Sequence, residues 1–159
     1  MSIEQVRAYL NRWNRDKDII ELDISTATVE LAAAALGVIP ARIAKSISLR
    51  GTDNNAMVIV TAGDMKIDNR KFRGIFGFKP KMLSPEEALT FTGHAIGGVC
   101  PFALPQGVEV YLDISLKRFQ TIFPACGSGS SAIEVTLPEL EEYSQNREWI
   151  DVCISIIPS

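Results

Sequence analysis

The first apolar residues of the chain recur every three or four positions, which places them on one face of a helix: Ile3, Val6, Tyr9, Leu10 and Trp13. Ser2 and Gln5 have the spacing of a capping box, so an amphipathic helix is predicted over residues 3–14. Other capped patterns predict a helix over 29–36, with Ser25, Thr26 and Thr28 as candidate caps, and helices from Asp68 to Gly77, from Ser84, and from Thr136 to about Gln145. Helical turns are predicted after Pro40 and near 116–119.

Apolar and polar residues alternate after Lys45, where Ile47 and Leu49 are separated by polar side chains. A turn at 51–55 and an apolar run at 57–61 complete a predicted β-hairpin. Further strands are predicted at 18–23, 78–83, 108–113, 121–126, 132–136 and 149–153, with a frayed end. Because helices and strands do not alternate regularly, the pattern favours an α+β fold with a mixed, curved sheet.

The length of 159 residues is that of one domain, which we expect to span residues 1–159. The N-terminus lacks the features of a signal peptide, and the longest apolar run, 31–41, is interrupted by Gly37 and Pro40. We therefore expect a cytoplasmic protein without a membrane partner. Its three cysteines, Cys100, Cys126 and Cys153, are expected to be reduced thiols.

The net charge of −3 argues against a protein that coats nucleic acid non-specifically. Charge is nevertheless uneven, because residues 64–81 hold six cationic side chains and two acidic ones, Asp64 and Asp68. The cationic residues are Lys66, Arg70, Lys71, Arg73, Lys79 and Lys81. This segment is either a site for a few phosphates or a solvated helix face.

The most informative segment is the glycine loop, residues 93–102, in which three glycines and Pro101 interrupt an apolar run. Gly97 and Gly98 permit positive φ angles and a close approach of another molecule to the backbone. Pro101 stiffens the exit of the turn. The loop predicts either a pocket wall with accessible N–H groups or a tight turn that closes a sheet.

Two motifs in the chain match known chemistry only in part. Gly127-x-Gly129-x-x-Ala132 has the letters of a dinucleotide fingerprint, but a strand instead of a helix is predicted after it, which favours a hairpin turn. His94 and Cys100 could form a nucleophile pair; the alternative is a loop histidine beside a small apolar thiol. One histidine and three scattered cysteines do not have the spacing of a zinc site, and no metal is expected.

Lys45 stands where a helical turn leads into a strand, a position that suits either a cleft or an ordinary surface lysine. The chain resembles the YbaK/EbsC family in four features taken together: Lys45, the glycine loop, Asp113 and the turn at Gly127. Members of that family are free-standing aminoacyl-tRNA deacylases, similar to the editing domain inserted in bacterial prolyl-tRNA synthetases. The resemblance extends from Thr28 to Val135.

The resemblance implies a barrel-like mixed sheet surrounded by helices, and hydrolysis of the ester that joins a wrong amino acid to tRNA. It implies that Lys45, Gly97 and Gly98 are the catalytic residues. The residues that it places around the substrate are Ser46, Thr61, His94, Cys100, Pro101, Asp113, Gly127 and Ser128. The implied partners are the acceptor end of aminoacyl-tRNA, most simply tRNA-Pro, and prolyl-tRNA synthetase; no cofactor is implied.

Ester hydrolysis depends on orientation and on stabilisation of an oxyanion more than on a strong nucleophile. Backbone N–H groups near Gly97 and Gly98 could supply that stabilisation, and Lys45 could anchor a phosphate or the carbonyl. Ala132 stands where several family members have an acidic residue, and Cys100 and Ala103 also depart from the common pattern. These departures leave the amino acid open, together with two alternatives: a non-catalytic binding module and a hydrolase that depends on Cys100.

Overall fold

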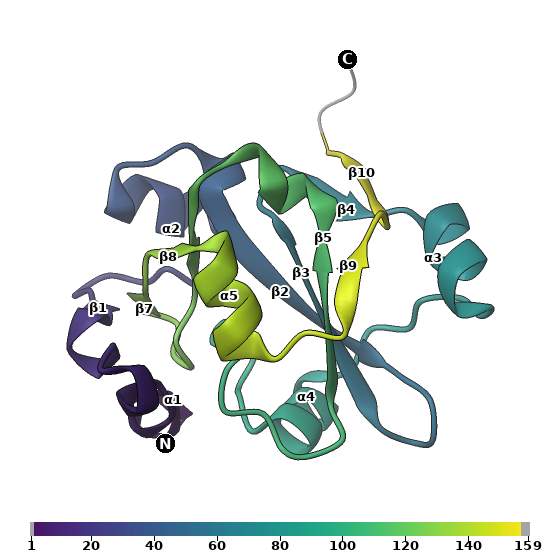
Figure 1. Cartoon of the computed structure of the whole chain (residues 1–159), viewed down its shortest axis with the longest axis horizontal. Helices are drawn as coiled ribbons and strands as arrows, with labels where there is room; N and C mark the ends of the chain where they lie inside the picture. The colour runs from purple at the N-terminus through teal and green to yellow at the C-terminus, as the bar shows by residue number, and fades with distance from the viewer. Residues whose placement is uncertain (1, 157–159) are drawn as a thin grey trace.

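A six-stranded mixed sheet forms the centre of the protein, in the order β8-β6-β2-β3-β5-β9 (Figure 1). This computed structural model describes residues 2–156. The strands are β2 (Ile43–Arg50), β3 (Ala56–Ala62), β5 (Glu109–Asp113), β6 (Thr121–Pro124), β8 (Val135–Thr136) and β9 (Glu148–Ile150). The β2–β3 and β6–β8 pairs are antiparallel and the others parallel, and the sheet curls into a half-barrel. The predicted α+β fold with a mixed, curved sheet is therefore confirmed.

The central strand β3 is buried on both faces, which explains its apolar run from Ala56 to Val60. Val58 and Val60 on one face belong to a core cluster that includes Phe102 of the glycine loop. Ile59 on the other face belongs to a cluster that includes Phe72. The sheet thus has a core on each side, and the glycine loop is packed into one of them.

Two small antiparallel sheets tie distant segments together. β1 (Ile20–Glu21) pairs with β7 (Ser131–Ala132). β4 (Met65–Ile67) pairs with β10 (Cys153–Ser155), so the end of the described chain returns to the residues that follow β3. The alternation in the sequence did not predict β4, and it merged β9 and β10 into one strand at 149–153.

Five α-helices are present among residues 2–156: α1 (Ser2–Leu10), α2 (Val29–Leu36), α3 (Asn69–Phe76), α4 (Pro85–Thr92) and α5 (Leu137–Ser144). Short 3₁₀ helices occur at Asn11–Trp13, Asp16–Asp18, Pro40–Arg42 and Ile114–Arg118. The predicted caps Thr28, Asp68, Ser84 and Thr136 all accept a backbone N–H at the start of their helices. Ser2 differs, because it lies inside α1 and its hydroxyl contacts His94.

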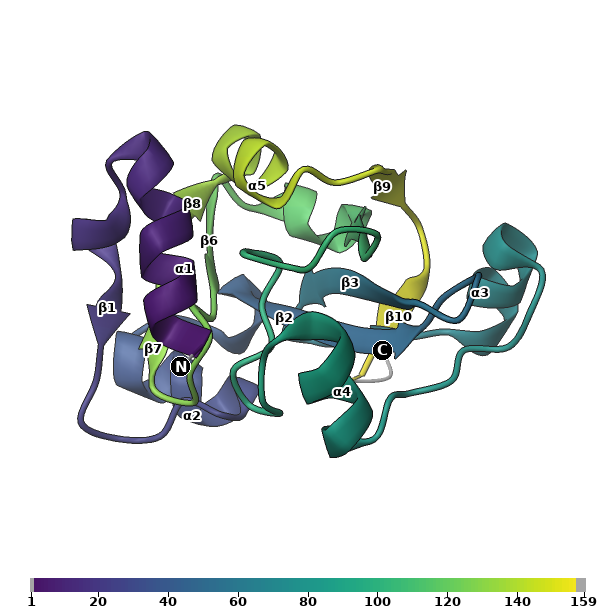
Figure 2. The ribbon, with the colours of Figure 1, turned by 90° about the horizontal axis from the view of Figure 1, so that it is seen from below.

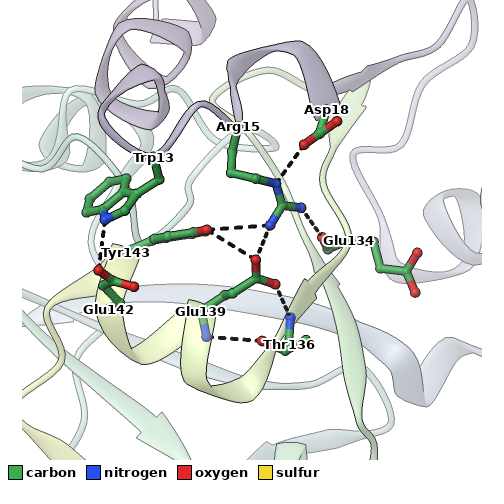
Figure 3. Close-up of polar contacts among 8 residues, drawn as sticks. All are labelled: Trp13, Arg15, Asp18, Glu134, Thr136, Glu139, Glu142 and Tyr143. Atoms are coloured by element: carbon green, nitrogen blue, oxygen red, sulfur yellow. Dashed lines mark hydrogen bonds and ion pairs between the residues drawn. The ribbon is translucent and has the colours of Figure 1, made fainter.

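Arg15 joins the N-terminal segment to α5 (Figure 3). Its guanidinium donates to Asp18 at 2.7 Å, to the carbonyl of Glu134 at 2.8 Å and to the carboxylate of Glu139. Glu139 also completes the capping box with Thr136. The same carboxylate therefore caps α5 and holds the segment that leads from α1 to β1.

Several predicted strands are shorter than the sequence indicated, and three of them differ most. Residues 78–83 form only a single bridge, Leu49 to Met82, because Pro80 has no N–H to donate to a ladder. The strand predicted over 132–136 is divided into β7 and β8. The strand predicted over 18–23 is reduced to β1, two residues long.

Candidate functional site

A cavity of about 290 Å³ opens where β2 loses its neighbour. β6 pairs with β2 only at Ile43 and Ala44, and the next contact on that side is the bridge at Leu49. The cavity is lined by residues 43–48 of β2, residues 26–29 and Ala32 at the start of α2, and Ile96, Gly97 and Val99 of the glycine loop. Met82, Phe123, Ala125, Ser131 and Ala132 complete the lining. Strand β2 and the glycine loop, far apart in sequence, therefore share one hollow.

Lys45 is the one charged residue of the cavity lining. It is half-buried, and its ammonium donates a hydrogen bond of 2.6 Å to the carbonyl of Met65 in β4. The pKa of Lys45 is lowered, chiefly because burial disfavours the charged form, while Cys153, Glu30 and Asp64 act to raise it. The sheet thus holds a cation at the cavity, and the C-terminal β4–β10 pair holds its hydrogen-bond acceptor.

The carbonyl of Met65 is available to Lys45 because of the register of the β4–β10 pair. Met65 lies opposite Ser155, and the N–H of Ile156 donates to the carbonyl of Asp64 at 2.9 Å. This pattern makes Met65–Ser155 a non-hydrogen-bonded pair, in which the polar groups of Met65 point away from β10. They point toward the side from which Lys45 approaches.

Gly97 and Gly98 of the glycine loop have different roles in the structure. Gly97 lines the cavity with a φ of +94°, and its N–H has no hydrogen-bond partner in the described chain. Gly98 is buried behind it, and its N–H donates to the carbonyl of Ala95 at 2.9 Å. A Cβ at Gly98 would lie 2.7 Å from the carbonyl carbon of Gly127. Gly97 can therefore donate to a substrate oxygen, whereas Gly98 packs the loop against the turn at Gly127.

The side chains of His94 and Cys100, both within the glycine loop, are fully buried, with the Cys100 Sγ 3.5 Å from the Nε2 of His94. The carbonyl of Phe102, 2.8 Å from Nε2, can only accept a hydrogen bond, so Nε2 carries the hydrogen and cannot serve as a base for the thiol. Burial lowers the pKa of His94 and raises the pKa of Cys100 to about 12. The interpretation as a nucleophile pair is therefore wrong, and the two residues anchor the loop.

Thr61 and Asp113 are also buried outside the cavity lining, in a network beneath the sheet. Both carboxylate oxygens of Asp113 accept backbone N–H groups at 2.9 Å, from Ser115 and from Val152. The Thr61 hydroxyl lies 3.2 Å from the thiol of Cys153. Because Thr61 is the strand partner of Lys45, this network holds the sheet under Lys45 and fastens the C-terminal segment to it.

Of the remaining predicted site residues, one lines the cavity and the others do not. Ser46 lines the cavity, and its buried hydroxyl has no hydrogen-bond partner in the described chain. The cavity lining does not include Pro101, Gly127 or Ser128. The Ser128 hydroxyl donates a hydrogen bond to the hydroxyl of Ser131, which is a lining residue. The turn after Gly127 leads into β7, a strand, which removes the helix that a dinucleotide site needs.

Sequence reasoning missed much of the wall of the cavity. Residues 26–29, Met82, Ile96 and Phe123 line it but carry no chemical motif. The one signal was Thr28, whose role as the cap of α2 fixes the residues before that helix. No residue of the lining is acidic, so the cavity contains no carboxylate that could act as a general base.

The model of the aminoacyl-tRNA editing domain matches residues 24–143, which include all of the cavity lining. The chain belongs to the aminoacyl-tRNA editing domain family. It is 59% identical to the uncharacterized protein YwhH of Bacillus subtilis strain 168, over 96% of this chain and 98% of that protein. It is 26% identical to EbsC of Enterococcus faecalis, described as a candidate Cys-tRNA(Pro)/Cys-tRNA(Cys) deacylase, over 68% of this chain and 66% of EbsC.

Two further similarities extend the comparison of this editing domain. It is 30% identical to part of the proline–tRNA ligase of Pelobacter propionicus, over 54% of this chain and 15% of the ligase. A crystal structure described as that of a candidate trans-editing enzyme for prolyl-tRNA synthetase superposes with a TM-score of 0.86 at 27% identity, covering 97% of this chain and 98% of that one. None of the described helices of this editing domain has the length and apolar character needed to cross a membrane.

Proposed function

We propose that this editing domain is a free-standing hydrolase that releases a small, wrongly attached amino acid from the 3′ end of a tRNA, most simply tRNA-Pro. The observation that carries the proposal is the meeting of Lys45 and Gly97 in one cavity. A cation and an unpaired backbone N–H in the lining of one cavity suit an ester whose carbonyl oxygen gains negative charge during hydrolysis. The reaction would take place in the cytoplasm and would correct errors of prolyl-tRNA synthetase.

In the proposed reaction, water hydrolyses the ester while Gly97 and Lys45 hold its polar groups. Water attacks the ester carbonyl, the bond from the carbonyl carbon to the ribose oxygen breaks, and the proton of the water passes to that ribose oxygen. The Gly97 N–H donates to the developing oxyanion, and the Lys45 ammonium holds the adjacent phosphate or the carbonyl side. Because the lining has no acidic or histidine side chain, a ribose hydroxyl or a group of the substrate assists the water. No cofactor enters this scheme.

The cavity wall also supports the preference for a small amino acid. Five alanines (Ala27, Ala32, Ala44, Ala125 and Ala132) line it together with Val29 and Phe123. Short apolar side chains provide dispersion contacts, and the polar side chains of the lining other than Lys45 are five hydroxyls, which supply no negative charge for a cationic amino acid: Thr26, Thr28, Ser46, Ser48 and Ser131. We therefore expect alanine, serine or cysteine esters to be better substrates than those of charged amino acids.

The test is a deacylation screen of tRNA-Pro and other tRNAs charged with small amino acids, using the wild type and Lys45→Ala, Lys45→Met and Lys45→Arg. Lys45→Met preserves much of the length of the side chain without its charge, so it separates charge from packing. We expect loss of at least 100-fold in kcat/KM for the alanine and methionine variants, with unchanged circular dichroism. Undiminished turnover by a folded Lys45→Met variant would reject the site.

A binding module without catalysis is the second candidate, and the absence of any acidic residue from the cavity lining favours it. In that case the wild type would bind mischarged tRNA but hydrolyse no member of the panel. The same screen therefore distinguishes the two functions when it is run beside a binding measurement.

A further inference from the structure

A second hollow, of about 420 Å³, lies directly beyond the candidate site along β2. One of its walls is formed by Arg50 and residues 51–53 at the tip of the β2–β3 hairpin. The other is formed by Phe78, Lys79 and Lys81, in the segment that joins α3 to α4. The two hollows adjoin, because Ser48 and Met82 line the first and the nearby Arg50 and Lys81 line the second. Figure 2 shows this joining segment running beside the β2–β3 hairpin into α4.

The second hollow is positively charged in a chain whose net charge is −3. Lys79 and Lys81 are exposed and form no ion pair with any of residues 2–156. Arg50 forms an ion pair with Glu87, and Asp53 is the one acidic residue of the lining. The Glu87 carboxylate also interacts with Lys81 electrostatically at longer range. The hollow therefore offers an anion two ammonium groups without an ion pair, of which Lys81 is partly balanced by Glu87.

The backbone that carries these lysines is held firmly against β2. The N–H of Arg50 donates to the carbonyl of Lys81 at 2.9 Å, and the N–H of Leu83 donates to the carbonyl of Ser48 at 3.2 Å. Leu83 itself is buried. Phe78 packs edge-on against Phe72, with ring centroids 5.7 Å apart, and is only half-buried. The hollow thus combines two placed cations with a partly accessible aromatic ring.

We propose that this second hollow binds the single-stranded 3′ strand of the tRNA, with backbone phosphates on Lys79 and Lys81 and a base against Phe78. Cationic side chains beside an aromatic ring are the usual means of holding single-stranded nucleic acid without reading its sequence. Ser46 in the candidate site and Arg50 in the hollow are four residues apart on one strand, about 13 Å. A strand that leaves the cavity past Met82 reaches the hollow within a few nucleotides. This inference rests on the proposed function, which places the aminoacyl end in the cavity.

Only part of the basic segment 64–81 is placed to contact phosphates of the tRNA. Lys71 is not available, because its ammonium donates to Asp151 and to the carbonyl of Cys153, each at 2.9 Å. Lys66 and Arg70 are exposed but line neither hollow. Lys79 and Lys81 alone, of the six cationic residues in that segment, border a hollow that joins the site.

The experiment compares the double variant Lys79→Ala/Lys81→Ala with a matched control, Lys66→Ala/Arg70→Ala, which removes the same charge from the same segment. Each variant is assayed with two substrates: the full aminoacyl-tRNA, and a 3′-aminoacyl adenosine that lacks the preceding phosphates. We expect kcat/KM for the full tRNA to fall at least tenfold in the Lys79/Lys81 variant only, with no change for the adenosine ester. For single strands each phosphate contact contributes about 0.7 to the salt slope, so log KM against log salt becomes shallower by about 1.4.

Two outcomes overturn the proposal: an equal loss in the control variant, or an equal loss on both substrates. If the wild type hydrolyses neither ester, the proposed function fails, and the hollow is then tested by fluorescence anisotropy with an uncharged RNA oligonucleotide ending in CCA. Binding that weakens tenfold only in the Lys79/Lys81 variant supports the RNA site. Binding that is equal in both variants rejects it.

Discussion

Gly98→Ala is the substitution that examines most directly how the glycine loop is built. The added Cβ would lie 2.7 Å from the carbonyl carbon of Gly127, 2.8 Å from its oxygen and 2.8 Å from the amide nitrogen of Ser128. All three atoms belong to the backbone, so no side chain can rotate away. To restore an ordinary contact of about 3.4 Å, the glycine loop and the turn at Gly127 must separate by roughly 0.7 Å.

The effect on activity follows from that displacement, because Gly97, directly before the substituted residue, lines the cavity and has an N–H without a partner in the described chain. A misplacement of about 1 Å in a catalytic group costs on the order of 100-fold in rate. We expect kcat/KM of Gly98→Ala to fall by roughly 10- to 100-fold. Overpacking of this kind costs about 1–3 kcal/mol in the free energy of unfolding, so the variant should still fold.

The assay is deacylation of the best substrate from the screen, run beside thermal unfolding. The matched control is Gly74→Ala on α3, where an added Cβ meets no atom within 4 Å. Alanine is favoured over glycine inside a helix by about 1 kcal/mol, so this control should be slightly more stable and fully active. Wild-type kcat/KM and wild-type stability in Gly98→Ala would refute the account of the loop.

Three other substitutions or conditions give further predictions. Ser46→Ala removes a buried hydroxyl that has no partner in the described chain, so the free energy of unfolding should stay equal or rise by about 1 kcal/mol while kcat/KM falls about 3- to 10-fold; an unchanged kcat/KM would mean that Ser46 does not bind substrate. Cys100→Ser should keep kcat/KM within about threefold and lose about 1–2 kcal/mol of stability in a denaturant titration, because the thiol is structural; loss of activity in the folded variant would restore the thiol as a nucleophile. Burial lowers the pKa of Lys45, so activity that needs its ammonium should decline as the pH rises through that lowered pKa, below the 10.5 of a free lysine. The measurement is enzyme-dependent deacylation, corrected for alkaline hydrolysis of the ester. A decline that begins only above pH 10.5 would contradict this prediction.

The elements that the sequence predicted well are those whose signals are local. The caps at Thr28, Asp68, Ser84 and Thr136 and the β2–β3 hairpin each depend on a few neighbouring residues, and the structure confirms them. The pairing of β4 with β10 is of another kind, because it joins residues far apart along the chain and three residues carry too short an alternation to be recognised. The pairing matters because the carbonyl of Met65, on β4, receives the Lys45 ammonium.

The site shows the same division between local and non-local information. Residue types marked Lys45 and the glycine loop as chemically unusual, and the structure brings Lys45 and Gly97 to one cavity. Residue types alone could not distinguish Gly97 from Gly98. The N–H of Gly98 donates to the carbonyl of Ala95, whereas the N–H of Gly97 has no partner in the described chain. Nor could they show that the Cys100 thiol is fully buried beside a histidine whose ring N–H already donates to the carbonyl of Phe102.

The cavity has a topological cause that connects these observations. β2 pairs along its whole length with β3, but on its other side β6 departs after Ala44 and the segment before α4 arrives only at Ser48. Backbone groups alternate in direction along a strand, and the bonds of Ser48 and Arg50 to that segment place the polar groups of even-numbered residues on this side. The backbone polar groups of Ser46 therefore face the cavity that this residue lines. A strand edge left open inside a protein is costly unless a ligand or water satisfies it. Under the proposed function, a polar substrate in the cavity would satisfy the open backbone groups of Ser46.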